Sequence, residues 1–349
     1  MSRQPNPRAT STPRRVTIED IAKSLDISAM TVSRAMRGHP EISEATKLKV
    51  LERAKEMNYR PNRWARSLVT QESQVIGLVV PDISHAYFAD IAAGAQEVLE
   101  QKGYNLLLCR SNRDAQTELK EIEMLLDSRV AGLLVASEQP EKSWQFFGRL
   151  KKERVCFVLI DRTFPRLSCD RIVTDDHEVG VLATAHLAEL GHRLIAHVRG
   201  PEMSTARQRV EGYKDVLERH GLRMNPEWIV PGGFRADESR EAARWLMQQS
   251  PRPTAVFAAS DLSAFGVVAG CRDAGYRVPE DVAVVGVGNI EGDQHPQPFL
   301  TTIDWQRREM GCEAALTLLR RIEGGPVGKA EVRVFPPRLL VRSSSRTSC

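Results

Sequence analysis

The decisive stretch of this sequence is residues 16–37, VTIEDIAKSLDISAMTVSRAMR. Its pattern predicts one short helix over residues 18–25 and a second over residues 29–36, with a tight turn between them. Two short helices joined in this way are typical of a helix-turn-helix. A third helix is expected after Ser43, and Pro61 ends the regular structure. The alternative interpretation is an ordinary three-helix bundle whose arginines are simply exposed.

Side chains that can cap helices or contact DNA stand at the ends and on the surface of these helices. Thr17 precedes the first helix with Asp20 at the capping-box position, and Ser28 precedes the second. Arg34 on the second helix has a forked guanidinium that can pair bidentately with a guanine in the major groove. Short hydroxyl side chains suit contacts with phosphate oxygens, and the residues assigned to that role are Thr17, Ser28, Thr31 and Ser33.

Charge is unevenly distributed along the chain. Residues 1–70 hold 14 Lys and Arg against 7 Asp and Glu, a net charge of +7, whereas the rest holds 35 against 38, a net charge of −3. A basic head on a mildly acidic body favours attraction to a phosphate backbone. Residues 1–15 lack periodicity and are expected to be a disordered basic arm, and residues 62–70 are expected to form one short basic amphipathic helix.

Between residues 75 and 287, apolar runs rich in β-formers alternate with amphipathic stretches of helical length. Continuous apolar strands with helical crossovers predict parallel sheets covered on both faces, and so many units favour two lobes. The expected strands are 75–80, 104–109, 130–135, 155–160, 194–198, 255–259 and 282–287. The expected helices lie near 86–102, 114–128, 141–152, 177–190, 205–220, 236–249 and 261–274.

Several classes of protein are disfavoured by composition. The six cysteines form no CxxC pair, so neither a disulfide framework nor a thiolate zinc site is indicated. No apolar run approaches the roughly 20 residues that span a bilayer, and the basic N-terminus lacks the apolar core of a secretory signal. The chain is therefore expected to be cytoplasmic, without a membrane partner. No HExxH spacing, phosphate loop or activated nucleophile is evident, so we expect no metal, no cofactor and no catalysis.

Motifs along nearly the whole chain resemble the lactose/galactose-repressor (LacI/GalR) family. The head motifs are VTIEDIAKSLDISAMTVSRAMRG and NYRPNRWARSL. The later motifs are IGLVVPDISHAYFADIAAGAQEVLEQKGY, LIDR, GHRLIAHVRG, RQRVEGYKDVL, PTAVFAASD, VPEDVAVVG and PFLTTID. The resemblance implies an α helix-turn-helix head and an α/β two-lobed, periplasmic-binding-protein-like core with parallel sheets. It also implies a transcriptional regulator, a repressor, whose affinity for DNA is set allosterically by a small effector between the lobes.

For the head, the resemblance implies specific contacts with DNA. Ala29, Met30 and Arg34 occupy the positions with which family members read bases. The segment 62–70 matches the family's hinge helix, which enters the minor groove, with Ala65 one turn before Leu68 at the place of an intercalating leucine. The alternative for Leu68 is simple packing against the core. A homodimer would bind double-stranded DNA with a pseudo-palindromic operator, its half-sites roughly one helical turn apart.

For the core, the resemblance implies an effector cleft of eight residues. Its carboxylates can accept bonds from hydroxyls, its arginine can fork onto ring oxygens, and its aromatic rings can stack on a sugar or base. Taken singly, each residue is better explained by surface charge or core packing. The cleft interpretation is stronger for Asp161, at the end of an apolar strand, and for Arg209, on a helix that follows a strand. The residues are Tyr87, Phe88, Asp161, Thr205, Arg209, Phe234, Asp261 and Asn289. Many relatives carry an acid where this chain has Gly288, and the loss of that acid leaves room for a larger or more acidic ligand. A sugar-like effector is the main expectation, and a nucleobase or phosphorylated co-repressor is the alternative.

The domain boundaries follow from these assignments. The expected units are the arm 1–15, the head 16–60, the hinge and linker 61–73, the core 74–342 and the tail 343–349. Lobe crossings near 173, 301 and 331 would give lobe 1 about 74–173 and 302–331, and lobe 2 about 174–301 and 332–342. No leucine heptads follow the core, so a dimer is expected rather than a tetramer. A solute-binding protein remains a less favoured alternative, because the head and the absence of a signal peptide argue against it.

Overall fold

The computed structural model describes residues 16–59, 73–292, 297–324 and 328–346. The chain forms two compact units, Met1–Glu72 and Ser73–Cys349. The expected arm and the expected hinge helix, with Ala65 and Leu68, lie outside the described residues.

The described part of the first unit is a three-helix head, and it confirms the predicted helices. Its elements are α1 (Ile18–Leu25), α2 (Ala29–Met36) and α3 (Glu44–Glu56). Ile21, Val32 and Val50, one from each helix, are fully buried in a common small core. This core explains why such short helices are stable, since each is too short to persist alone in water.

The predicted caps of the head are confirmed. The Thr17 hydroxyl accepts a hydrogen bond from the Asp20 backbone N–H at 3.2 Å, and the Asp20 carboxylate accepts one from the Thr17 backbone N–H at 2.9 Å. The Ser28 hydroxyl accepts a bond from the Thr31 backbone N–H at 3.0 Å. These bonds fix where α1 and α2 begin, because they satisfy backbone donors that have no partner within the helix.

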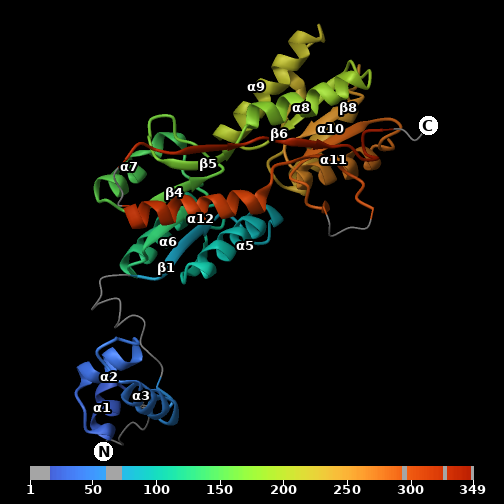
Figure 1. Cartoon of the computed structure of the whole chain (residues 1–349). Helices are drawn as coiled ribbons and strands as arrows, with labels where there is room; N and C mark the ends of the chain where they lie inside the picture. The colour runs from blue at the N-terminus through green and yellow to red at the C-terminus, as the bar shows by residue number, and fades with distance from the viewer. Residues whose placement is uncertain (1–15, 60–72, 293–296, 325–327, 347–349) are drawn as a thin grey trace, which may run out of the picture. The chain divides into compact units, whose positions relative to one another are not determined.

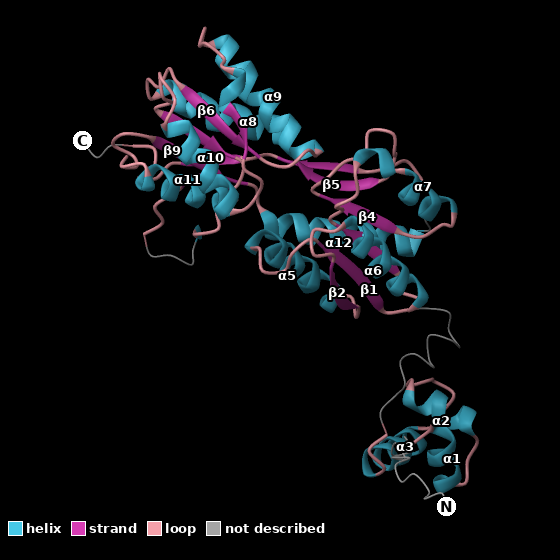
Figure 2. Cartoon of the chain, turned by 180° about the vertical axis from the view of Figure 1, so that it is seen from behind, coloured by secondary structure: helices cyan, strands magenta, loops and turns pink. Residues whose placement is uncertain are grey.

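The second unit contains two lobes, each built on one six-stranded sheet (Figures 1 and 2). In lobe 1 the strand order is β11-β5-β4-β3-β1-β2, and every pairing is parallel. Its strands are β1 (Val75–Val80), β2 (Asn105–Arg110), β3 (Gly132–Val135), β4 (Phe157–Ile160), β5 (Asp170–Thr174) and β11 (Val332–Phe335). Its helices are α5 (Ala86–Gln101), α6 (Ala115–Asp127), α7 (Gln145–Lys152) and α12 (Arg307–Gly324).

Lobe 2 repeats this architecture with the order β12-β10-β9-β8-β6-β7, in which only β12 is antiparallel to its neighbour. Its strands are β6 (Ile195–Arg199), β7 (Ile229–Pro231), β8 (Ala255–Ala258), β9 (Ala283–Val287), β10 (Thr301–Asp304) and β12 (Arg338–Leu340). Its helices are α8 (Asp176–Glu189), α9 (Ser204–Arg219), α10 (Ala236–Met247) and α11 (Asp261–Asp273). Short 3-10 turns lie at Glu141–Ser143 and Pro226–Trp228.

Two of the three lobe crossings lie later in the chain than expected. β10 pairs with β9 and so belongs to lobe 2, which moves the second crossing from 301 to just after Asp304. β11 pairs with β5 and belongs to lobe 1, which moves the third crossing from 331 to just after Phe335. The reason is that both strands add to sheet edges left open by the earlier strands, and pairing satisfies their backbone groups.

Helices cover both faces of each sheet, as the continuous apolar strands predicted. In lobe 1, α12 runs beside α5 although the two are more than 200 residues apart in sequence (Figure 1). Their contact depends on glycine, because a β-carbon at Gly94 would overlap the backbone carbonyl of Arg308. No helix in the described part of the chain is long and apolar enough to cross a membrane.

Candidate functional site

The first candidate surface is the outward face of α2. Val32 and Ala35 are buried against the rest of the head, whereas Ala29 is exposed and Met30 is 64% exposed. Arg34 is half-buried, and its Nη1 lies 3.0 Å from Oε2 of the exposed Glu41. The predicted base-reading residues therefore share one short helix whose other face is fixed by the core.

The second candidate site is a cavity at the carboxyl ends of the strands of both sheets. It holds about 480 Å³ of space between side chains, part of which is open to solvent. Both lobes contribute to its walls, at the edge where ligands bind in open α/β sheets. The lining residues are His85, Tyr87, Phe88, Arg113, Glu138, Asp161, Arg162, Thr205, Arg209, Phe234, Ser260, Val287 and Trp305.

On the lobe 1 side, a carboxylate and a phenol face each other directly after β4 and at the start of α5. The Tyr87 hydroxyl donates to Oδ1 of Asp161 at 2.9 Å. Burial raises the pKa of Asp161, with Arg162 and Arg209 opposing that rise, and burial likewise raises the pKa of Tyr87. Asp161 has a φ of 72°, in a region that residues other than glycine seldom occupy. The neighbouring structure therefore holds this carboxylate against a local backbone cost.

Arg162 lies beside Asp161, with its Nε 3.9 Å from Oδ2 of Asp161, but it pairs more closely with a different acid. Its guanidinium makes a double ion pair with Glu138, with N–O distances of 2.9 Å, and also donates to the Ser137 carbonyl at 2.5 Å. Beneath it, the buried Glu118 accepts bonds from the Ser137 hydroxyl and the Glu138 backbone N–H. Burial raises the pKa of Glu118 to about 7. Glu118 thus fixes the loop after β3, which contains Glu138, the ion-pair partner of Arg162.

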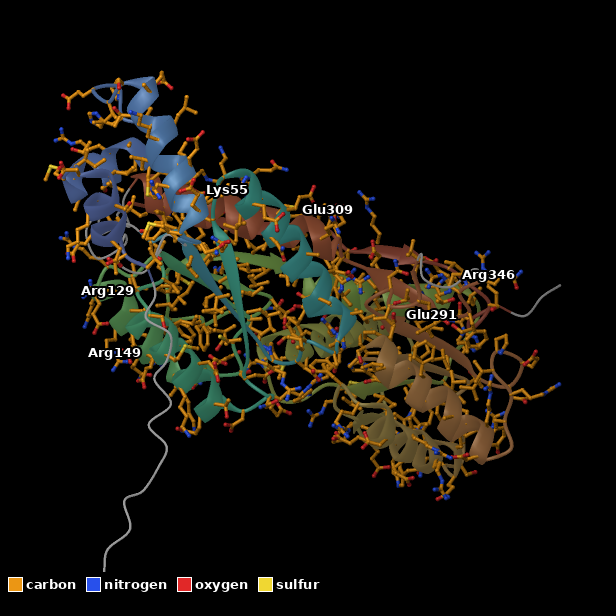
Figure 3. All side chains as sticks on the ribbon, turned by 90° about the horizontal axis from the view of Figure 1, so that it is seen from below. Lys55, Arg129, Arg149, Glu291, Glu309 and Arg346 are labelled. Atoms are coloured by element: carbon orange, nitrogen blue, oxygen red, sulfur yellow. The ribbon has the colours of Figure 1, made fainter. Side chains whose placement is uncertain are left out.

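On the lobe 2 side, Arg209 makes three hydrogen bonds within the protein. Its Nε and Nη2 donate to Oδ1 of Asp176 at 2.8 and 2.6 Å, and its Nη1 donates to the Ala259 carbonyl at 2.6 Å. Burial raises the pKa of Asp176 to about 6, although Arg209 pulls it down. Arg209 is 2% exposed and Arg162 is 8% exposed, unlike the exposed surface arginines Arg129, Arg149 and Arg346 labelled in Figure 3.

The structure brings six of the eight predicted cleft residues together around the cavity. They are Tyr87, Phe88, Asp161, Thr205, Arg209 and Phe234. The other two, Asp261 and Asn289, are not among the lining residues and make their bonds within lobe 2 or at its edge. Asp261 accepts from the Ile290 backbone N–H at 2.7 Å and the Thr302 hydroxyl at 2.5 Å. The Asn289 side chain accepts from Arg342 at 2.6 Å.

Seven lining residues were not assigned to the cleft from the sequence. Arg162 fitted either a cleft residue or an ordinary loop charge, and a signal existed for some of the others. Ser260 and Val287 lie at the carboxyl ends of β8 and β9, where the rule that selected Asp161 also applies. Glu138 follows β3 in the same way. Trp305 follows β10, which was not predicted as a strand, although the motif PFLTTID ends at the residue before it.

Gly288, which replaces the acid of many relatives, has a φ of 131°, and a β-carbon there would lie 3.8 Å from Oδ2 of Asp261. An aspartate side chain at position 288 would therefore begin close to the buried carboxylate of Asp261. Among the residues that the structure describes, no group of three or more His, Cys, Asp or Glu is placed to hold a metal ion.

Asp261 is expected to stabilise the loop after β9. Asp261→Ala would leave the Ile290 N–H and the Thr302 hydroxyl without their acceptor, and should lower the free energy of unfolding by about 2–4 kcal/mol. Burial raises the pKa of Asp261 to about 6, above its unfolded value of about 3.9, so the folded state binds the proton more tightly. The contribution of this group to stability should therefore increase as the pH falls from 7 to 5.

Thermal unfolding of the wild type, Asp261→Ala and Asp261→Asn at pH 7 and pH 5 checks both expectations. Asp261→Asn keeps one oxygen acceptor but cannot titrate, so it should lose less stability than Asp261→Ala and lack the pH slope of Asp261. Equal stability of wild type and Asp261→Ala at pH 7 would contradict the assigned role.

Comparison with known proteins connects these features to two families. Residues 17–62 match "Bacterial regulatory proteins, lacI family", and residues 184–345 match "Periplasmic binding protein-like domain". The chain is 34% identical to the HTH-type transcriptional repressor PurR of Haemophilus influenzae (strain PittEE) over 337 residues, covering 95% of this chain and 99% of the relative. It is 33% identical to PurR of Aliivibrio salmonicida (strain LFI1238) over 332 residues, covering 94% and 98%.

Solved structures agree in fold over nearly the whole chain. The lac repressor dimer bound to operator and the anti-inducer ONPF has a TM-score of 0.85 at 25% identity, covering 96% of this chain and 100% of the other. The complex of the transcriptional regulator CelR with cellobiose has a TM-score of 0.70 at 29% identity, covering 95% and 100%.

Proposed function

Because the chain belongs to the lacI family of bacterial regulatory proteins, it is a DNA-binding transcriptional repressor controlled by a small effector, and we propose which of its residues contact the operator and which class of effector it binds. Like its relatives, it binds operator DNA as a dimer. The proposal concerns the residues that read the operator and the chemical class of the effector.

In the head, Ala29, Met30 and Arg34 read base edges in the major groove. Arg34 supplies the directional contact, a bidentate bond to guanine, while Ala29 and Met30 contact thymine methyl groups. Phosphate contacts come from the hydroxyls of the helix caps and of α2, which are Thr17, Ser28, Thr31 and Ser33. In the hinge segment, Ala65 and Leu68 enter the minor groove, where Leu68 unstacks one base step.

In the core, the effector binds in the cavity between the lobes and is a small neutral ring bearing hydroxyl groups, such as a sugar. The observation that carries this proposal is the charge balance of the lining. Arg162 is neutralised by Glu138 and Arg209 by Asp176, and the third lining arginine, Arg113, pairs with Asp82 at 3.8 Å, so each guanidinium of the lining already has an acidic partner. Asp161 receives the Tyr87 hydroxyl on one oxygen, and its other oxygen can accept from a ligand hydroxyl.

The aromatic lining supports a ring-shaped ligand. Tyr87 and Phe88 lie edge to face with centroids 4.9 Å apart, and Phe234 lines the cavity from lobe 2. The complex of the transcriptional regulator CelR with cellobiose shows that a protein of this fold can hold a sugar. A flat nucleobase would also stack on these rings and is the second candidate. A phosphorylated ligand fits less well, because its charge would approach the buried Asp161 carboxylate.

A thermal-shift screen of the full-length protein tests the effector class. The probes are D-ribose, D-glucose and cellobiose, with glucose 6-phosphate and hypoxanthine as the rival classes. We expect at least one neutral sugar to raise the melting temperature, since a ligand that binds only the folded state stabilises it. A rise with glucose 6-phosphate or hypoxanthine and none with any sugar would contradict the proposed class.

The relatives are repressors, and we infer that this chain has no catalytic step. The carboxylates of the cavity are engaged by Tyr87, Arg162 and Arg209. Incubation of the protein with cellobiose should return the sugar unchanged, and release of glucose would contradict this inference.

A further inference from the structure

Trp305 lies at one of the crossings between the two lobes. It follows β10 directly, at the point where the chain leaves lobe 2 for α12 of lobe 1. Its side chain lines the cavity and is only 6% exposed. Trp305 was not among the residues expected to contact the effector.

The indole of Trp305 contacts both lobes. The guanidinium carbon of Arg209, from α9 of lobe 2, lies 4.7 Å from the ring centroid, within the range of a cation–π interaction. The Tyr87 ring, from α5 of lobe 1, lies 5.1 Å away at an interplanar angle of 52°. The indole ring therefore packs between Arg209 of lobe 2 and Tyr87 of lobe 1, two polar residues that line the cavity.

The indole nitrogen has no such partner. Nε1 of Trp305 is buried, and within the described residues no acceptor lies at hydrogen-bonding distance from it. Burial of an N–H without an acceptor is unfavourable, and buried tryptophans usually bond this group. Packing alone does not require the N–H, because a phenylalanine would supply an aromatic ring without an unpaired donor.

We propose that Trp305 is a specificity-determining residue of the effector site, whose indole N–H donates a hydrogen bond to an oxygen of the bound ligand. This inference rests on the proposed effector cavity and adds one requirement for the ligand. The ligand presents an acceptor oxygen towards the lobe crossing while its ring packs near Tyr87. A hydroxyl or ring oxygen of a neutral sugar meets this requirement, and Asp161 accepts from another hydroxyl of the same ring.

Trp305→Phe separates this role from packing, because it deletes the N–H and keeps an aromatic ring. In the ligand-free protein no protein hydrogen bond is lost, but the smaller ring fills less of the buried space and weakens the contact with Arg209, so the melting temperature should fall modestly. Affinity for the sugar with the largest thermal shift among D-ribose, D-glucose and cellobiose should fall about tenfold, the effect of one lost hydrogen bond. Binding is measured by isothermal titration calorimetry on the full-length protein.

Two variants provide matched controls. Tyr87→Phe also removes one polar group from an aromatic residue of the cavity, but that group bonds Asp161, so this variant should lower the ligand-free melting temperature. Trp245→Phe changes an exposed tryptophan on α10 and should alter neither stability nor affinity. An affinity of Trp305→Phe for the sugar equal to that of the wild type would overturn the proposal.

The indole N–H can also be observed directly in protein labelled with [15N]tryptophan. The signal missing from the Trp305→Phe spectrum identifies Trp305, and we expect added sugar to shift it. A sugar that binds without moving this signal would leave the proposed function intact and refute the inference. A shift caused by hypoxanthine alone would support the donor role of Trp305 and refute the sugar class. No shift of the Trp305 signal with D-ribose, D-glucose, cellobiose or hypoxanthine would refute the inference.

Discussion

Replacing Arg209 with alanine is expected to lower the free energy of unfolding of the core by about 3–5 kcal/mol, because it leaves a buried carboxylate without its counter-ion. Arg209 is 2% exposed, and it makes two bonds to Asp176 and one to the Ala259 carbonyl. Alanine would remove all three bonds and the contact with the Trp305 ring. Urea-induced unfolding of the wild type and Arg209→Ala at pH 7 measures the loss.

The double variant Arg209→Met/Asp176→Leu is the matched control. It removes both charges and fills the space with apolar side chains, and replacements of this kind are often close to neutral for stability. We expect it to recover much of the stability lost in Arg209→Ala. If it keeps the fold, it also tests the ligand role of Arg209, since operator binding should persist while the response to sugar is lost. An Arg209→Ala protein as stable as the wild type would contradict the buried ion pair.

Replacing Arg34 with alanine is expected to weaken operator binding by about 1–3 kcal/mol, a loss of roughly 5- to 150-fold, and to relax the preference at one base pair. The side chain stands on α2, the second helix of the helix-turn-helix, next to the exposed Ala29 and Met30. Fluorescence anisotropy with the operator and with single-base variants of it, at one fixed salt concentration, measures both effects.

Glu41 provides the control for Arg34. In the described head Arg34 pairs with Glu41 at 3.0 Å, and this exposed ion pair contributes about 1 kcal/mol at most. Arg34 must exchange this partner for a guanine when it binds DNA. Glu41→Ala should therefore leave operator affinity unchanged or raise it. A uniform loss of affinity across all base variants in Arg34→Ala would identify a phosphate contact instead of a base contact.

Local signals predicted the head well. Thr17, Asp20 and Ser28 act within a few residues of their own positions, so the sequence contains everything needed to place the caps. In the core, fully buried central strands such as β1 and β9 appear as continuous apolar runs and were found. Five strands of the described chain were not predicted. The interior strands β5 and β10 read DRIVT and TTID, which mix polar and apolar residues, and the edge strands β7, β11 and β12 are only three or four residues long.

The cavity was predicted only in part for a related reason. Asp161 and Arg209 were identified through motifs, but the acids that neutralise the arginines depend on tertiary contacts. Asp176 lies 33 residues before Arg209, and no spacing rule connects such a pair. Asp261 belongs to the same strand-end pattern as Asp161, yet its carboxylate accepts bonds from the Ile290 N–H and the Thr302 hydroxyl. Which way such a side chain turns is decided by the donors around it.

Coupling between the two sites is the central claim, and operator affinity measured with and without the effector tests it most directly. The operator is first obtained by selecting bound duplexes from a random pool with the full-length protein, and the dissociation constant is then determined with and without the sugar identified by thermal shift. We predict a selected palindrome with half-sites about one helical turn apart. We also predict that the sugar changes the dissociation constant by about 5- to 150-fold, a coupling free energy of 1–3 kcal/mol. A dissociation constant that is the same with and without a sugar that saturates the cavity would contradict the account.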